Sequence, residues 1–237
     1  MTTSRPAFYA LTGGRLADFV TLLHLPYTLW HLSYVVIGAA LATQIDGQRL
    51  LGTLVAFAVG LGVGAHALDE LHDRPLSTRL SATSLRFLGW GGLAASAAIA
   101  LVGWYVISPV SLLWGAAGVL LAAGYALEWS TWLHSAAGFA IAWGAFPVMV
   151  GYWAQTESIS FSAVVVAGAA AILSMTQRAL STPARYVRRN TADATAAVGD
   201  QDWDQSNLLS TWERPLQLLA LAHVLLAVGL LLTHLPA

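Results

Sequence analysis

The densest group of side chains able to bind a cation or a phosphate lies between residues 66 and 73. Positions i, i+3, i+4 and i+7 share one face of an α-helix, and here they are occupied by His66, Asp69, Glu70 and Asp73. Three carboxylates on one face repel one another unless a cation lies between them, and carboxylate oxygens suit Mg²⁺. The spacing predicts a Mg²⁺ site held by Asp69 and Asp73, with Glu70 and His66 supporting it. The alternative is that these are solvated loop charges paired with neighbouring arginines.

A group of arginines later in the chain could bind the anionic partner of such a metal. Its members are Arg178, Arg185, Arg188 and Arg189. Arginine donates paired hydrogen bonds to phosphate oxygens, so an acidic group facing a basic one would hold a metal-bound diphosphate. Arg178, which directly follows an apolar segment, and Arg74 are expected to contact phosphate. For Arg188 and Arg189 the favoured interpretation is that they only fix the membrane topology.

The acidic and basic groups are linked by a partial internal repeat. Residues 74–78 read Arg-Pro-Leu-Ser-Thr and residues 178–182 read Arg-Ala-Leu-Ser-Thr. In this register Gln177 replaces Asp73, so the second copy lacks the carboxylate. The repeat suits a bundle of two related halves with a site at their interface, although a match this short can arise by chance.

Histidines are the remaining candidates for chemistry inside the apolar part of the chain. His24 and His31 are seven residues apart and therefore share a helix face. Intramembrane histidines usually face the interior of a bundle, as ligands, proton carriers or satisfied core groups. We expect these two, together with His72 beside the acidic group, to contact a substrate. A purely structural role is the alternative for His24 and His31.

Composition determines the kind of scaffold that positions these side chains. Of the 237 residues, 57% are hydrophobic and 10% are charged, against roughly 25% charged in soluble domains. This excludes a globular protein that faces water on all sides. The absence of cysteine excludes disulfides, thiolate catalysis and cysteine-bound metals. The net charge of −1 gives no reason to expect a nucleic-acid partner, so the lipid bilayer is the expected environment.

Seven apolar stretches are long enough to cross a bilayer, which takes about 20 residues in an α-helix. They are residues 20–43, 50–68, 85–107, 109–127, 135–154, 160–178 and 214–233. Unpaired strands cannot cross lipid. The predicted fold is therefore all-α, a single polytopic bundle of about seven transmembrane helices that covers residues 1–237.

The positions of arginine predict the orientation of this bundle. The chain has eleven basic side chains, and all of them are arginines. With a cytoplasmic N-terminus, every arginine except Arg49 falls on the cytoplasmic side, as the positive-inside rule requires. Two long cytoplasmic loops are then expected, over residues 69–84 and 179–213. The acidic group, and any active site built on it, would face the cytoplasm from the plasma membrane.

These features resemble the UbiA superfamily of intramembrane prenyltransferases. That family carries Asn-Asp-x-x-Asp-x-x-x-Asp at the cytoplasmic end of its second helix, and residues 65–73 here read Ala-His-Ala-Leu-Asp-Glu-Leu-His-Asp. Asp69 and Asp73 match the last two aspartates of the motif, while His66 replaces the first. The resemblance covers most of residues 15–185. Two departures are the absence of the family's second aspartate motif and seven predicted helices where family members usually have nine.

The resemblance implies a Mg²⁺-dependent enzyme that binds a prenyl diphosphate and ionises it to an allylic cation within the bundle. An acceptor then captures the cation, so the implied activity is prenyl transfer to a small or lipid acceptor. Aromatic faces stabilise cations, and Tyr125 is a candidate for this part of substrate binding. Three alternatives stay open: terpene cyclisation, a non-catalytic protein that binds an isoprenoid or a partner, and a small transporter. The prenyl length, the acceptor and the oligomeric state stay open as well.

Overall fold

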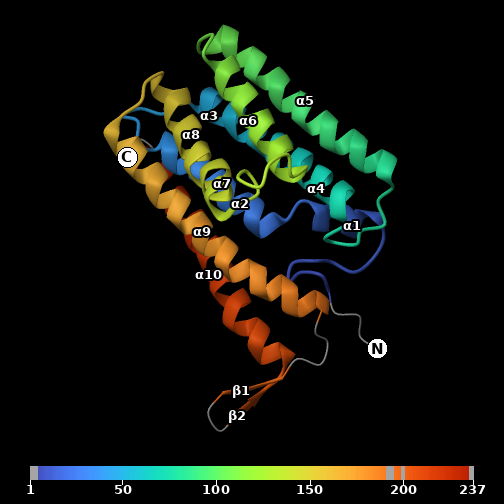
Figure 1. The fold of residues 1–237 in the computed structure, drawn as a ribbon. Coiled ribbons are helices and arrows are strands. Elements are labelled where there is room, and N and C mark those ends of the chain that lie inside the picture. Colours follow the sequence, from blue (N-terminus) through green and yellow to red (C-terminus); the bar gives the residue numbers. More distant parts are fainter. Residues whose placement is uncertain (1–4, 191–194, 199–200, 235–237) are drawn as a thin grey trace.

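The computed structural model describes the whole chain except residues 1–4, 191–194, 199–200 and 235–237. In chain order, its helices and strands are α1 (Arg15–Leu22), α2 (Leu25–Ala39), α3 (Gly47–Phe57), the π-helical segment η1 (Ala58–Ala65), α4 (His66–Asp73), α5 (Ala82–Val106), α6 (Ser111–Ala126), α7 (Ala136–Ala140), the π-helical segment η2 (Ile141–Ala145), α8 (Phe146–Thr156), α9 (Phe161–Asn190), β1 (Ala196–Val198), β2 (Gln201–Trp203) and α10 (Gln205–Leu232). Figure 1 shows the helices gathered in one bundle, with the antiparallel β1–β2 hairpin at the end where α10 begins. Apart from this short hairpin, the predicted all-α fold is confirmed.

Six helical runs of the described chain are long and apolar enough to cross a membrane. They are Arg15–Ala39, Gly47–Asp73, Ala82–Val106, Ala136–Thr156, Phe161–Asn190 and Gln205–Leu232. The seventh predicted span, over residues 109–127, corresponds to α6, which has 16 residues and is therefore about 24 Å long. The hydrocarbon core of a bilayer is roughly 30 Å thick. The chain is a multi-pass helical membrane protein in which α6 is a shorter apolar helix than its neighbours.

The first span consists of two helices, where the sequence predicted one over residues 20–43. α1 ends at Leu22, α2 begins at Leu25, and His24 between them has a left-handed backbone with a φ of 46°. Pro26, in the first turn of α2, has no amide hydrogen to continue a ladder from α1. The break takes His24 out of the helical repeat, so its side chain is placed by the turn.

The second span is continuous but changes its winding. α3 is followed by η1 and then by α4 without a break, so one run extends from Gly47 to Asp73. Three alternate glycines in η1 remove side chains from this segment, and α5 approaches it closely. A Cβ on Gly92 of α5 would lie 2.6 Å from the carbonyl oxygen of Val59. The acidic group therefore lies on a helix that continues directly from the membrane span.

Both long loops are shorter than the sequence predicted. The expected loop over residues 69–84 begins only after Asp73, because α4 includes the acidic group. The expected loop over residues 179–213 is mostly helical, since α9 continues to Asn190 and α10 begins at Gln205. In both places the helix continues beyond the last apolar residue. Hydropathy alone therefore places the end of the helix too early. The arginines after residue 177 are consequently held on a helix.

The partial repeat has no structural counterpart. Residues 74–78 lie in the connection after α4, where Arg74 has a left-handed backbone with a φ of 53°. Residues 178–182 lie within α9. Pro75 removes an amide hydrogen that a helix would need at that point, whereas Ala179 allows the helix to continue. The two segments with matching sequences therefore adopt different backbone conformations.

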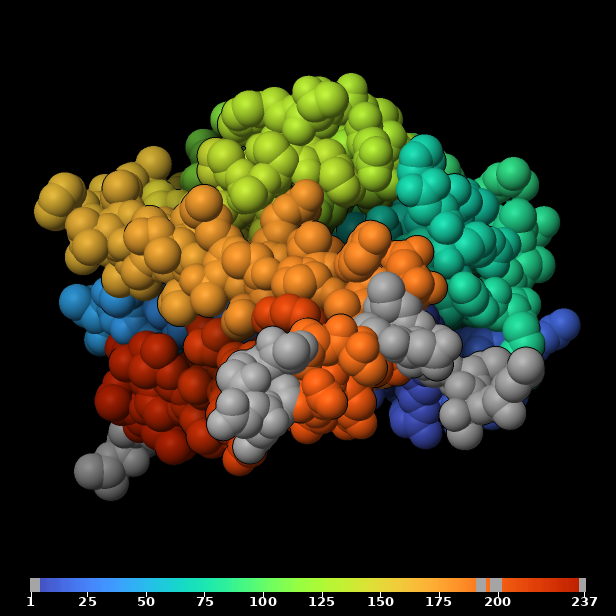
Figure 2. Space-filling model, turned by 60° about the horizontal axis from the view of Figure 1, so that its bottom comes forward, coloured from blue at the N-terminus to red at the C-terminus, as the bar shows by residue number. Residues whose placement is uncertain are grey.

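Close packing of α2 against α8 fixes the centre of the bundle. A Cβ on Gly38 would lie 2.1 Å from the Val148 carbonyl oxygen, and one on Gly151 would lie 2.1 Å from the Val35 carbonyl oxygen. Small residues permit such contacts where water cannot drive helices together. α9 packs beside α7, η2 and α10. In Figure 2, α9 (orange) lies between the segment around residues 120–145 (yellow-green) and α10 (red).

Candidate active site

A cavity of about 430 Å³, which we call the polar cavity, opens between α2, α4 and α9 and the connection from α6 to α7. Seven of the ten residues predicted to form the site line it, namely His24, His31, His66, Asp69, Asp73, Tyr125 and Arg178. They come from segments as far apart in the chain as His24 and Arg178. The structure therefore brings most of the predicted site together, and the exceptions are Glu70, His72 and Arg74.

The acidic wall of the polar cavity is the face of α4 that carries Asp69 and Asp73. The two are four residues apart, one helical turn, so their side chains project in nearly the same direction. Neither carboxylate has a hydrogen bond or a salt bridge to another residue in the described part of the chain. Both are therefore available to a ligand.

Glu70 belongs to a different environment, and its expected role beside the metal is corrected here. Its carboxylate is fully buried and accepts hydrogen bonds from the Leu76 amide at 2.8 Å, the Thr78 amide at 2.8 Å and the Thr78 hydroxyl at 2.9 Å. At 100° per residue, Glu70 lies at the edge of the acidic face and points toward the connection from α4 to α5. Its charge holds residues 74–81 in place and does not reach the polar cavity.

Arg74 is likewise used within that connection and does not line the polar cavity. Its Nη1 donates a hydrogen bond to the Leu80 carbonyl oxygen at 2.7 Å and a longer one to that of Thr78 at 3.4 Å. It lines a neighbouring hollow with Arg188 and residues of the N-terminal segment, and Asp73 and Arg189 line both this hollow and the polar cavity. The left-handed backbone at the end of α4 turns Arg74 out of the helical repeat of α4, and sequence spacing gives no sign of that turn.

The basic wall is one face of α9, formed by Arg178, Arg185 and Arg189. Arg178 donates hydrogen bonds to the Tyr125 hydroxyl and, at 2.8 Å, to the His134 carbonyl oxygen. Arg185 and Arg189 form no hydrogen bond or salt bridge with another described residue. Two unpaired guanidinium groups therefore line the same cavity as two unpaired carboxylates. Arg189, expected only to fix topology, in fact lines the site.

A third carboxylate reaches the cavity from a segment that the sequence did not single out. Glu128, just after α6, lines the polar cavity and forms a salt bridge of 3.4 Å with His134. Ligand atoms of His72, Asp73 and Glu128 all lie within 4.8 Å of one another. His72 does not line the polar cavity, but a ring nitrogen of His72 lies within 4.8 Å of a carboxylate oxygen of Asp73, which does. Glu128 could not be found from spacing, because 55 positions separate it from Asp73 in the sequence.

The donor set fits Mg²⁺ better than a softer metal. Asp69, Asp73 and Glu128 each offer carboxylate oxygens to the cavity, and Mg²⁺ prefers oxygen ligands and usually keeps several waters. The group is partly open to solvent, which would leave room for those waters and for phosphate oxygens. Of the two predicted ligands, Asp73 has a ligand atom within 4.8 Å of one of Glu128, and Asp69 lines the same cavity one helical turn away.

Gln177 lies where the UbiA resemblance would place carboxylates of a second motif. It is 3% exposed, it lines the polar cavity, and its Oε1 has no hydrogen-bond partner in the described part of the chain. A neutral amide oxygen can accept a hydrogen bond or contact a hydrated cation, but it contributes no charge. The second wall of the cavity is therefore basic rather than acidic.

The inner end of the cavity is aromatic. The rings of Tyr125 and Trp143 have centroids 5.4 Å apart, and Tyr125 lies 5.7 Å from Phe139. Nδ1 of His31 donates a hydrogen bond of 2.8 Å to the Trp143 carbonyl oxygen, which joins α2 to η2. Faces of aromatic rings attract cations, so this wall suits a positively charged group next to the charged mouth.

His24 and His66 stack on each other at the inner end, with ring centroids 4.1 Å apart. The hydroxyl oxygen of Tyr9 lies 3.1 Å from Nδ1 of His24. Burial raises the pKa of Tyr9 above its usual range, so the hydroxyl keeps its proton. When the phenol donates to Nδ1, the ring proton of a neutral imidazole is on Nε2. That Nε2 has no hydrogen-bond partner among the described residues. In that tautomer, Nε2 is a buried donor without a partner on a residue that lines the cavity.

Comparison with known proteins gives one point of reference. The chain is 28% identical over 179 residues to a protoheme IX farnesyltransferase from Jannaschia sp. (strain CCS1). That relative is a prenyltransferase by name. The match covers 70% of this chain and 57% of the relative, so the chain spans little more than half of the relative's length. No protein-family model and no solved structure matches the chain.

Proposed function

We propose that the protein is a UbiA-type membrane prenyltransferase that binds a prenyl diphosphate with Mg²⁺ in the polar cavity and transfers the prenyl group to a small or lipid acceptor. Similarity to a protoheme IX farnesyltransferase supports this class of reaction. The polar cavity would open to the cytoplasmic side of the plasma membrane, in keeping with the arginine distribution.

One observation supports the proposal above all others. Unpaired carboxylates of Asp69 and Asp73 on α4 and unpaired guanidinium groups of Arg185 and Arg189 on α9 line the same cavity. Opposed charges that do not pair with each other are stable together when a ligand of mixed charge lies between them. A diphosphate that carries Mg²⁺ is such a ligand, since its oxygens suit arginine and its metal suits carboxylate.

Each wall of the cavity has a part in the proposed chemistry. Mg²⁺ held by Asp69, Asp73 and Glu128 would neutralise charge on the diphosphate oxygens. Arg178, Arg185 and Arg189 would bind the remaining oxygens, and Nε2 of His24 could donate one more hydrogen bond. These contacts favour departure of the diphosphate with the electron pair of its bond to carbon.

The aromatic inner wall would receive the carbon that loses the diphosphate. Tyr125, Phe139 and Trp143 place ring faces around this end of the cavity, where they would stabilise the developing allylic cation. They also limit the access of water, which would otherwise capture the cation. A nucleophilic atom of the acceptor would form the new bond to the same carbon, and its proton would pass to the departed diphosphate.

Turnover of isoprenoid diphosphates tests the proposal. The purified protein is incubated in detergent with Mg²⁺, geranyl, farnesyl or geranylgeranyl diphosphate and candidate acceptors, and released diphosphate is measured. Asp73→Asn and Asp69→Asn are each expected to slow release at least 100-fold, because one ligand of the metal is lost. Arg185→Gln is expected to raise KM by about tenfold, because it contacts only the diphosphate.

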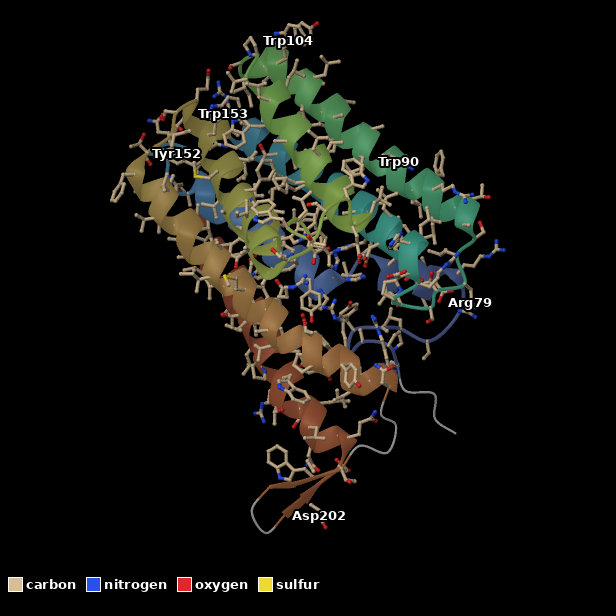
Figure 3. All side chains as sticks on the ribbon, viewed as in Figure 1. Arg79, Trp90, Trp104, Tyr152, Trp153 and Asp202 are labelled. Carbon is tan, nitrogen blue, oxygen red and sulfur yellow. The ribbon has the colours of Figure 1, made fainter. Side chains whose placement is uncertain are left out.

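Asp202→Asn is the matched control, since Asp202 is exposed on β2 outside the cavity (Figure 3). It should leave the rate unchanged. If the Asp73→Asn and wild-type proteins release diphosphate at the same rate, Asp73 is not a ligand of the metal. Tight Mg²⁺-dependent binding without release for all three chain lengths would instead show a binding protein.

A further inference from the structure

A second cavity, of about 310 Å³ and almost wholly apolar, lies beside the polar cavity. We call it the apolar cavity. Leu61 and Trp143 line both cavities and form the partition between them. The apolar cavity extends between α3, η1, α5, α6 and α8 as far as Arg49, near the start of the second span. Helical rise puts that end about 35 Å from Asp73, at the opposite side of the bundle.

Among the polar groups of the lining, two buried side-chain atoms on α6 have no hydrogen-bond partner in the described part of the chain. They are the Ser111 hydroxyl and the Trp114 indole N–H, and both are shielded from solvent. Ser111 is 6% exposed. The two residues are three apart on α6, so they lie on neighbouring positions of one helix face. A buried donor left without a partner costs about 1–3 kcal/mol, and a ligand oxygen at this point would recover that energy.

The charge at this end is already neutralised, which limits the kind of ligand. Arg49 lines the cavity, but its Nη1 donates to Glu157 at 3.0 Å and to the Ala154 carbonyl oxygen at 3.3 Å. No other charged side chain of the described residues lines the cavity. A charged head group would therefore lack a partner here, whereas a neutral oxygen would find two donors. Trp114 can only donate, so the ligand atom must be an acceptor.

We propose that the apolar cavity is a second ligand site, which binds an uncharged isoprenoid-sized molecule whose hydroxyl or carbonyl oxygen accepts hydrogen bonds from Ser111 and Trp114. The volume lies at the lower end of the range for small-molecule sites. Trp143, Trp114 and Trp153 supply large apolar surfaces along its length. The site needs neither Mg²⁺ nor a diphosphate, so it stands apart from the chemistry proposed for the polar cavity.

Binding of the C15 alcohol farnesol, compared with the C15 hydrocarbon farnesene, tests this site. Protein in detergent is mixed with deuterated farnesol, bound molecules are counted by native mass spectrometry, and unlabelled competitors are added. Farnesol is expected to displace the label at least tenfold more effectively than farnesene, because only farnesol has an acceptor oxygen. Ser111→Ala and Trp114→Phe should each reduce that preference about threefold to tenfold, the usual effect of one lost hydrogen bond.

Two glycine variants test the location without removing a polar group. A Cβ on Gly52 has no atom within 4 Å and Gly52 lines the cavity, so Gly52→Phe fills the space without a clash near the backbone. It should weaken farnesol binding at least tenfold. Gly168→Phe is the control, because Gly168 is also unobstructed but is exposed on α9, outside the cavity.

The outcomes separate this site from the polar cavity. Asp69→Asn should bind farnesol as the wild type does, even if it releases no diphosphate. Equal displacement by farnesol and farnesene, or undiminished preference in a Ser111→Ala, Trp114→Phe double variant, overturns the proposal. So does the absence of retained farnesol in the wild-type protein.

Discussion

Neighbouring acidic residues on α4 have different roles because their carboxylates lie in different environments. Asp69 and Asp73 face the polar cavity without a partner, whereas Glu70 is surrounded by three donors of residues 74–81. A buried carboxylate with its hydrogen bonds satisfied organises the backbone around it. Glu70 therefore has a structural role, although it lies between two candidate metal ligands in the sequence.

Replacing Glu70 should harm the fold more than the chemistry. Glu70→Ala leaves the amides of Leu76 and Thr78 buried without an acceptor, which we expect to lower the free energy of unfolding by about 3 kcal/mol. Thermal unfolding in detergent measures the loss, with exposed Asp202→Ala as the unaffected control. Diphosphate release per folded molecule should remain within about threefold of the wild type. A variant with normal thermal stability and no release would assign Glu70 to the reaction instead.

Spacing along the sequence could group site residues only where they share a helix. His66, Asp69 and Asp73 lie on one run of α4, so their spacing indicated a common face. Glu128 reaches the cavity through tertiary packing, and Tyr9 reaches the ring of His24 in the same way, so nothing in their local sequence distinguishes them. Arg185 and Arg189 were visible as basic residues, but their common face became apparent only because α9 extends beyond its apolar part.

At the scale of helices, the cavity depends on contacts between α2 and α8. These helices approach through Gly38 and Gly151, and the same contact keeps His31 within 2.8 Å of the Trp143 carbonyl oxygen. Hydropathy predicted where such helices lie, because about 20 apolar residues are needed to cross lipid. It could not predict the break at His24 or the π-helical winding of η1, since neither changes the hydrophobic pattern.

Two glycine-to-alanine changes should have opposite effects on stability. Gly151→Ala puts a methyl group 2.1 Å from the Val35 carbonyl oxygen, so α2 and α8 must separate, at a cost of about 1–3 kcal/mol. Gly91→Ala enters open space on α5 and should stabilise the helix by up to about 1 kcal/mol. Thermal unfolding of both variants in one detergent measures the difference. If both variants unfold at the same temperature, the α2–α8 contact is looser than described.

At the scale of the whole molecule, the bundle has two chemically different ends. The connection that contains Arg79 lies at one end of α5 and Trp104 near the other, as Figure 3 shows. The first end holds the polar cavity and its arginines. The second is closed by Arg49, which joins the start of α3 to Glu157 after α8. An excess of arginine at the first end predicts that it faces the cytoplasm.

The lack of native cysteine makes this orientation directly testable. Ser77→Cys lies in the connection after α4 and Ser158→Cys in the connection between α8 and α9, and both serines are exposed. A membrane-impermeant maleimide should label Ser158→Cys in intact cells and Ser77→Cys only in inverted membrane vesicles. The wild type, which has no thiol, is the blank. The reverse pattern would place the polar cavity outside the cell.

The π-helical winding of η1 makes the length of this segment as important as its composition. A π-helix closes i→i+5 hydrogen bonds and takes more residues per turn than an α-helix, so the angular phase of α4 relative to α3 depends on how many residues wind in this way. If η1 rewound as α-helix with the same sequence, α4 would rotate relative to α3. Asp69 and Asp73 would then turn away from α9, although every charged residue would still be present. The site is thus set by a count of residues as well as by their identity.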